Sequence, residues 1–148
     1  MKVMTRDFGE VEVEEKDIVE FPQGIPGFAG RKEFVLVPVE DSPFIVLQSL
    51  EKEDLAFITV DSGEVLPGYE FEIDEQVEEQ LKLESIEDVL VLNIATIRDK
   101  VEDMTLNLTA PLVINHREGL GKQVILDEEK YPLRFQMMSQ KKSEEVGN

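Results

Sequence analysis

The chain has 148 residues, no cysteine and a formal net charge of −18, which arises from 33 acidic and 15 basic residues. This length is typical of one domain, and the lack of cysteine excludes disulfides and thiolate metal ligands. The charge argues against direct contact with nucleic acid or anionic membranes, because both require lysine and arginine to meet phosphates. The acidity is either a device for solubility or an acidic surface that meets a basic partner and holds RNA away from it.

The sequence opens with no charged and apolar leader, and no window approaches the ~18 apolar residues of a membrane span. We therefore expect a cytoplasmic protein. No internal repeat or linker divides the chain. We expect a single domain over residues 1–138, followed by a disordered polar tail over residues 139–148, which lack hydrophobic periodicity.

Short strands are predicted at the N-terminus, over residues 1–5 and 9–14, with a turn at residues 7–9. Val11 and Val13 alternate with glutamates, which is typical of a strand with one buried face and one acidic face. A third strand is expected over residues 17–21.

The segment from Phe21 to Phe28 contains two prolines and two glycines, a composition that predicts a rigid loop. Phe21 and Phe28 are expected to anchor the two ends of this loop in the core, whereas Ile25 at its tip has no evident core role. The loop is therefore either a structural connector or a preformed apolar contact surface, since a rigid loop binds at a lower entropic cost.

Three apolar runs over residues 34–39, 44–50 and 55–60 predict an antiparallel meander. Gln48 and Ser49 are polar residues late in the second run, where we expect them to close the strand by hydrogen bonding. Residues 61–68 are predicted to be loop and residues 69–73 another strand. Asp74 is then expected to cap a two-turn helix over residues 75–83.

The longest predicted strand covers residues 105–115, where apolar and mixed positions alternate with a period of two. Pro111 cannot donate to a ladder, so the strand must be at an edge, a bulge or a corner at that point. The preceding apolar strand, residues 89–97, contains Asn93, which needs partners because an unpaired buried amide costs ~1–3 kcal/mol. A glycine-containing loop over residues 116–121 predicts a hairpin between the long strand and residues 122–126.

Together these elements predict an all-β fold: a small, barrel-like, strongly bent antiparallel sheet with one short helix. Many short strands at close spacing are typical of such barrels, and a long strand with a break in its middle supplies the bend that closure requires.

The sequence offers little for catalysis. His116 is the only histidine, no serine lies in a G-x-S-x-G context, and no phosphate-binding loop or calcium loop is present. Adjacent carboxylates such as Glu78 and Glu79 fall on predicted solvated faces or turns. We therefore predict a binding module that is not an enzyme, with no catalytic residues, no metal site and no cofactor.

Several motifs together closely resemble the flagellar assembly factor FliW family. The resemblance extends over roughly residues 1–137, and the loop combined with the long strand makes it specific. The motifs are Phe21-Pro22-Gln23-Gly24-Ile25-Pro26-Gly27-Phe28, Leu47-Gln48-Ser49, Leu55-Ala56-Phe57, the segment from Thr105 to Asn115 with its Asn107-Leu108-Thr109-Ala110-Pro111 centre, and Gln123-Val124-Ile125-Leu126 with Tyr131.

The resemblance implies a small cytoplasmic β-barrel-like protein of flagellated bacteria that binds flagellin, the filament subunit, and CsrA, an RNA-binding translational repressor. Capture of CsrA would relieve repression of flagellin translation, and accumulating flagellin would reverse that capture. One alternative is a dedicated flagellin chaperone that does not bind CsrA. Another is a small-ligand barrel or an unrecognised carboxylate enzyme, which would need a polar cavity.

The residues that meet partners are predicted from the loop and the strand ends, with a sheet edge as a possible docking strand. Phe21, Phe28, Leu106, Leu108 and Ala110 are instead assigned to the core. The predicted partner contacts are Ile25, Pro26, Gln48, Ser49, Asn107 and Pro111.

Overall fold

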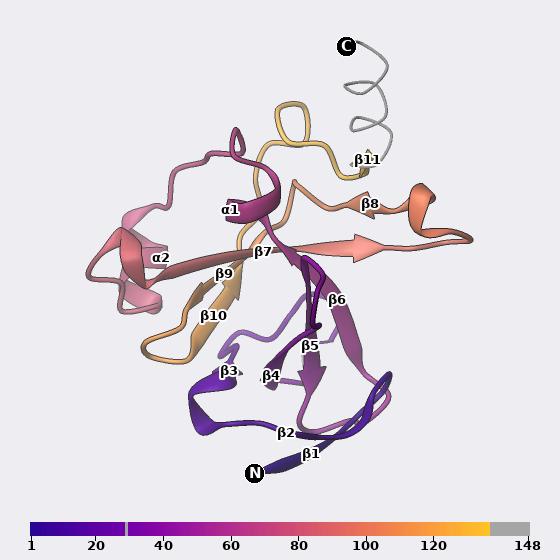
Figure 1. Ribbon diagram of the computed structural model, residues 1–148. Coiled ribbons are helices and arrows are strands. Elements are labelled where there is room, and N and C mark those ends of the chain that lie inside the picture. Colours follow the sequence, from indigo (N-terminus) through magenta and orange to yellow (C-terminus); the bar gives the residue numbers. More distant parts are fainter. Residues whose placement is uncertain (29, 137–148) are drawn as a thin grey trace.

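The structure, a computed structural model, describes residues 1–28 and 30–136 (Figure 1). The predicted tail over residues 139–148 lies outside this part of the chain. None of the helices in the described residues is long and apolar enough to cross a bilayer. The elements are β1 (Lys2–Thr5), β2 (Gly9–Glu12), η1 (Glu15–Asp17), β3 (Ile18–Glu20), β4 (Glu33–Pro38), β5 (Phe44–Ser49), β6 (Ala56–Asp61), α1 (Ser62–Val65), α2 (Glu75–Gln80), η2 (Ile86–Asp88), β7 (Val89–Thr96), η3 (Val101–Asp103), β8 (Thr105–Leu106), β9 (Leu112–Asn115), β10 (Leu120–Gln123) and β11 (Phe135–Gln136).

Seven strands close into a barrel. Their order is β7-β6-β5-β4-β3-β10-β9, and β9 pairs again with β7. All neighbours are antiparallel except β3 and β10, which meet in parallel at the single pair Leu120↔Glu20. The order continues beyond β7 through β8 to β11, and β1 with β2 forms a separate hairpin. The predicted all-β, barrel-like fold is confirmed.

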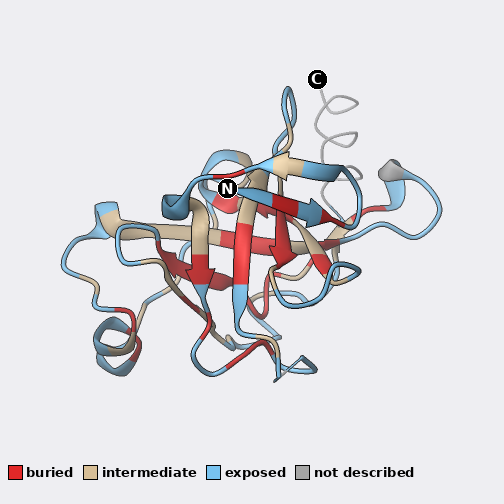
Figure 2. Ribbon diagram, turned by 90° about the horizontal axis from the view of Figure 1, so that it is seen from below, coloured by how far each residue is buried: buried red, intermediate tan, exposed pale blue. Residues whose placement is uncertain are grey.

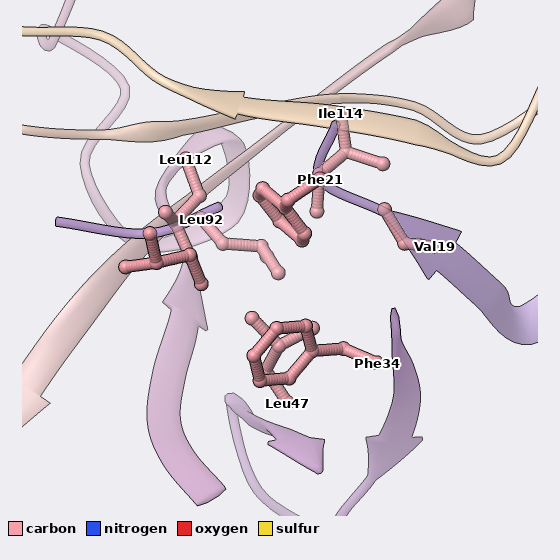
Figure 3. Close-up of a cluster of buried hydrophobic side chains, with 8 residues drawn as sticks. Val19, Phe21, Phe34, Leu47, Leu92, Leu112 and Ile114 are labelled. Atoms are coloured by element: carbon pink, nitrogen blue, oxygen red, sulfur yellow. The ribbon is translucent and has the colours of Figure 1, made fainter. Parts of the chain in front are cut away.

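The barrel interior is filled by apolar side chains that point toward one another from different strands (Figure 3). The rings of Phe21 and Phe34 meet edge to face with centroids 5.7 Å apart. Buried residues are concentrated on the strands, whereas most connecting loops are exposed (Figure 2). This interior is packed with apolar side chains and does not form a polar ligand cavity, which argues against the small-ligand barrel. The cluster consists of Val19, Phe21, Ile25, Phe34, Leu47, Leu92, Leu112 and Ile114.

The helix predicted over residues 75–83 is present as α2, which ends earlier, at Gln80. Asp74 caps it as expected, because its Oδ1 accepts a hydrogen bond from the Val77 N–H at 2.9 Å. Val77 and Leu81 pack against Val113 on the outside of the barrel. The helix is therefore held by tertiary packing, which a helix of this length requires.

The long strand predicted over residues 105–115 is wrong as one continuous element. The chain forms β8 over residues 105–106 and β9 over residues 112–115, and both pair with β7. Between them, the Asn107 side chain accepts a hydrogen bond from the Ala110 N–H at 3.0 Å, and Pro111 has no N–H to give. The break expected at Pro111 is thus a five-residue corner.

Two smaller predictions are also corrected. Residues 69–73 alternate in polarity but form no strand. Their apolar side chains pack instead, Tyr69 beside Leu108 and Phe71 beside Val77. The loop predicted over residues 61–68 contains the single-turn helix α1, and the Asp61 side chain accepts a hydrogen bond from the Gly63 N–H at its start.

The hairpin between β9 and β10 is confirmed, although β10 begins two residues earlier than predicted and ends at Gln123. Arg117 in its loop donates to the Asp88 carboxylate, with Nε 3.2 Å from Oδ1. This bond, with further hydrogen bonds from the Glu84 and Ser85 backbone, lowers the pKa of Asp88. The loop is thereby tied to η2.

Candidate functional site

Most of the predicted partner contacts are inside the protein. Ile25, Gln48, Ser49 and Pro111 are buried and Asn107 is half-buried, so only Pro26 is exposed. The structure does not bring the six residues together as one accessible patch. The buried side chains instead support loops whose other residues are exposed.

Gln48 and Ser49 are structural residues rather than surface contacts. The fully buried Gln48 amide donates to the Glu53 carbonyl at 2.9 Å and accepts from the Arg6 N–H at 2.9 Å. The Ser49 hydroxyl accepts from the N–H groups of Glu51 and Lys52 at 3.1 and 3.0 Å. Together they fix the turn between β5 and β6, as expected for residues that close a strand by hydrogen bonding. Both side chains are buried, so neither offers an exposed surface for the predicted contact with a partner.

Ile25 and Phe28 have the opposite roles from those predicted. Ile25 is 2% exposed and belongs to the core, whereas Phe28 is 41% exposed. The reversal follows from Gly24 and Gly27, whose φ angles of +70° and +89° turn the chain so that Ile25 faces inward. The Phe28 ring rests edge to face on Phe57, with centroids 5.3 Å apart. The apolar loop surface is therefore carried by Phe28.

Asn107 and Pro111 hold the corner between β8 and β9. Besides the Asn107 side-chain bond to Ala110, the Asn107 carbonyl accepts from Asn93 Nδ2 at 2.9 Å. The Pro111 carbonyl accepts from the Val124 N–H at 3.0 Å. Both residues therefore have a structural role at this corner, in place of the predicted contact with a partner.

The first accessible candidate surface is a notch of about 420 Å³ beside the Pro-Gly loop. Its two charged lining residues, Arg31 and Lys52, are both cationic, in a chain of net charge −18. Sequence reasoning missed Arg31 and Lys52. They could have been found in the sequence as cations next to a rigid aromatic loop in an otherwise acidic chain. We call this the Phe28 surface, and it is lined by Gly27, Phe28, Gly30, Arg31, Lys52 and Leu55.

The second candidate is a groove of about 570 Å³ between the segment that follows α1 and the segment that leads into β11. Both of its tyrosines are bonded to backbone carbonyls: Tyr69 Oη donates to Leu108 O at 2.7 Å, and Tyr131 Oη to Glu70 O at 2.6 Å. The groove is thus apolar with fixed aromatic walls. It is lined by Val65, Leu66, Pro67, Gly68, Tyr69, Leu108, Lys130, Tyr131, Pro132 and Phe135, and we call it the Tyr131 groove.

A buried amide supports the floor of this groove. The Asn93 Nδ2 group is satisfied, since it donates to Tyr69 Oη at 3.2 Å as well as to the Asn107 carbonyl. Its Oδ1 has no hydrogen-bond partner among the described residues. Burial raises the pKa of Tyr69 to about 12, so the hydroxyl is neutral and can donate at any physiological pH. The groove wall is therefore held in one arrangement.

Comparisons with known proteins agree with this architecture. The family model described as FliW protein matches residues 2–137. The flagellar assembly factor FliW of Geobacillus kaustophilus is 45% identical over 141 residues, which cover 95% of this chain and 98% of the relative. That of Clostridium kluyveri is 42% identical over 136 residues, which cover 91% and 94%. A crystal structure of the flagellar assembly factor FliW matches with a TM-score of 0.85 and 42% identity, over 93% of this chain and 96% of that one. The chain therefore belongs to the FliW family of flagellar assembly factors.

Proposed function

We propose that this protein works in the cytoplasm as a non-enzymatic binding protein that captures both flagellin and CsrA, antagonises CsrA, and so couples flagellin translation to filament assembly. The observation that carries the proposal is the family match over residues 2–137, which covers both candidate surfaces. A filled barrel with accessible surfaces outside it is the architecture of a binding module, and this supports the proposal.

Charge supports the CsrA arm of the proposal. A body of net charge −18 held beside a basic RNA-binding surface repels phosphates without covering that surface. Such repulsion acts over about 10 Å at an ionic strength of 0.1 M and is shorter at higher salt. We therefore expect the antagonism of RNA binding to weaken as salt is added, at full occupancy of the complex. Inhibition that is independent of salt would contradict this electrostatic account.

The test is size-exclusion chromatography of the protein mixed with CsrA, with and without flagellin. The proposal expects co-elution with CsrA and loss of that complex when flagellin is added. Capture of flagellin without CsrA would favour the dedicated chaperone. If neither partner co-elutes, the binding proposal is wrong for this chain.

A variant pair links that assay to the structure. Gly68→Asp adds a carboxylate at a residue that lines the Tyr131 groove, where the added Cβ meets no heavy atom within 4 Å outside the neighbouring residues. Ile125→Asp adds the same charge at a side chain that is 68% exposed and outside the groove. If an apolar segment of either partner occupies the groove, Gly68→Asp weakens that complex and Ile125→Asp leaves it unchanged.

A further inference from the structure

The two charged side chains that line the Phe28 surface, Arg31 and Lys52, are opposite in sign to the whole protein. Arg31 forms no ion pair within residues 1–28 and 30–136, although its charge contributes to the lowered pKa of Glu51. Lys52 Nζ lies 3.9 Å from Asp54 Oδ1, an exposed pair of a kind that contributes little. Between these cations lie two apolar side chains, the exposed Phe28 ring and Leu55.

The loop on one side of the notch is held by its own backbone. The Phe28 N–H donates to the Ile25 carbonyl at 2.7 Å, and the Arg31 N–H donates to the Phe28 carbonyl at 2.9 Å. The buried Ile25 side chain anchors the same loop to the barrel core. The backbones of Phe28 and Arg31 are therefore each restrained by a hydrogen bond.

The turn on the other side is equally constrained. Ser49 accepts from two N–H groups at its start, and Gln48 binds the carbonyls of Glu53 and Leu55. Glu51 links the two sides, because its Oε1 accepts from the N–H groups of Lys32 and Glu33 at 2.6 and 2.9 Å. These bonds lower the pKa of Glu51 and engage one of its two carboxylate oxygens. The backbone on this side of the notch is thus restrained, so the ordering cost of binding comes mainly from the Arg31 and Lys52 side chains.

We propose that the Phe28 surface binds an acidic segment of a partner protein, with an apolar side chain on Phe28 and Leu55 and carboxylates on Arg31 and Lys52. The inference deepens the proposed function and rests on it, because it gives the chemistry of one partner segment. The rest of this acidic protein repels such a segment, so the notch sets where it docks. A second copy of this chain is a poor occupant, since two bodies of net charge −18 repel each other.

The first experiment titrates the ¹⁵N-labelled protein with three blocked peptides and follows amide shifts by NMR. The acidic probe is Ac-GDLFEG-NH2, the neutral one Ac-GNLFQG-NH2 and the basic one Ac-GKLFKG-NH2. We expect the acidic peptide to shift the amides of Gly27, Phe28, Arg31, Lys52 and Leu55, and to bind about tenfold more tightly than the neutral peptide. Tenfold corresponds to about 1.4 kcal/mol, which two exposed ion pairs can supply.

Two double variants with equal charge change provide the control. Arg31→Gln with Lys52→Gln is expected to remove the preference for the acidic peptide. Lys2→Gln with Lys16→Gln removes two exposed cations elsewhere and is expected to preserve it. The proposal is overturned if no peptide binds, if the neutral peptide binds as well as the acidic one, or if the shifts fall outside the notch. It is also overturned if both double variants behave alike, or if the shifts report self-association.

The same variants separate this inference from the proposed function. Suppose that the wild-type protein captures flagellin or CsrA, and that the Arg31→Gln, Lys52→Gln variant captures each of them equally well. That result overturns the acidic-segment site but leaves the proposed function standing. A wild-type protein that captures neither partner overturns the proposed function, while the peptide titration still decides the chemistry of the notch.

Discussion

Gln48→Leu is expected to destabilise the protein strongly although it replaces one buried side chain with another of similar size. The Gln48 amide joins the N-terminal hairpin to the turn between β5 and β6, through the Arg6 N–H and the Glu53 carbonyl. Leucine fills the volume but offers neither a donor nor an acceptor.

The magnitude follows from the groups left behind. The Leu55 carbonyl, which also binds the Gln48 amide, keeps a bond from the Ser49 N–H at 2.9 Å. The Arg6 N–H and the carbonyls of Ser49 and Glu53 lose their bonds to the side chain. An unsatisfied buried group costs about 1–3 kcal/mol, and water recovers part of this where burial is partial. We expect the free energy of unfolding to fall by about 2–4 kcal/mol.

Urea denaturation followed by circular dichroism measures this loss. With a slope of about 2 kcal/mol per molar urea, the midpoint should fall by about 1–2 M without a change of slope. Gln23→Leu is the matched control, because Gln23 is exposed in the Pro-Gly loop and should change stability by less than about 0.5 kcal/mol.

A Gln48→Leu variant as stable as Gln23→Leu would refute this reasoning, since the orphaned groups would then have other partners. Native stability combined with lost capture of flagellin or CsrA would go further. That result would return Gln48 to the role of a partner contact.

Three more outcomes follow from the packing and the charges. Gly121→Ala puts a methyl group 2.7 Å from two ring carbons of Phe21 and should cost about 1–3 kcal/mol of unfolding free energy, whereas Gly68→Ala, with open space around it, should be nearly neutral in the same urea assay. The raised pKa of Tyr69 stabilises the fold fully below pH 10.0, the ordinary value, and this stability should disappear as the pH rises through about 12; NMR of ring-labelled tyrosine would reveal a normal pKa if burial is not the cause. The pKa of Asp88 is lower in the folded state, so this carboxylate stabilises the fold above pH 3.8, its ordinary pKa, and the stabilisation is lost as the pH falls through the lower folded value. Asp88→Asn should therefore flatten the acid limb of the curve of unfolding free energy against pH. An unchanged acid limb would contradict the ion pair with Arg117.

Hydrophobic periodicity predicts the strands well where each segment has a neighbouring strand to pair with. β2, β5 and β7 lie close to their predicted bounds, and so does the hairpin of β9 and β10. Residues 69–73 show the limit of that signal, because alternation records which side chains pack and not whether the backbone has a neighbour. Burial against α2 and Tyr131 produces the same alternation without a ladder.

The candidate surfaces are harder to predict because they depend on which way single residues face. In the Pro-Gly loop, two residues with positive φ decide that Ile25 points inward and Phe28 outward, and sequence gives the glycines but not the sense of the turn. Gln48 and Ser49 were recognisable as unusual polar residues in an apolar run. Their burial follows from hydrogen-bond partners that are distant in sequence, such as Arg6.

The seam of the barrel, where β3 meets β10, also bears on how the chain folds during synthesis. Residue 20 pairs with residue 120, and the Glu20 N–H donates to the Gly119 carbonyl at 2.8 Å, so closure must wait until most of the chain has left the ribosome. Closing so long a loop is entropically costly and slow. Until then the meander of β3 to β6 has two open edges, which can pair with other nascent chains. The newly made protein is therefore most exposed to misassembly before β10 emerges, and the Glu20 amide should be among the first strand amides to exchange with solvent.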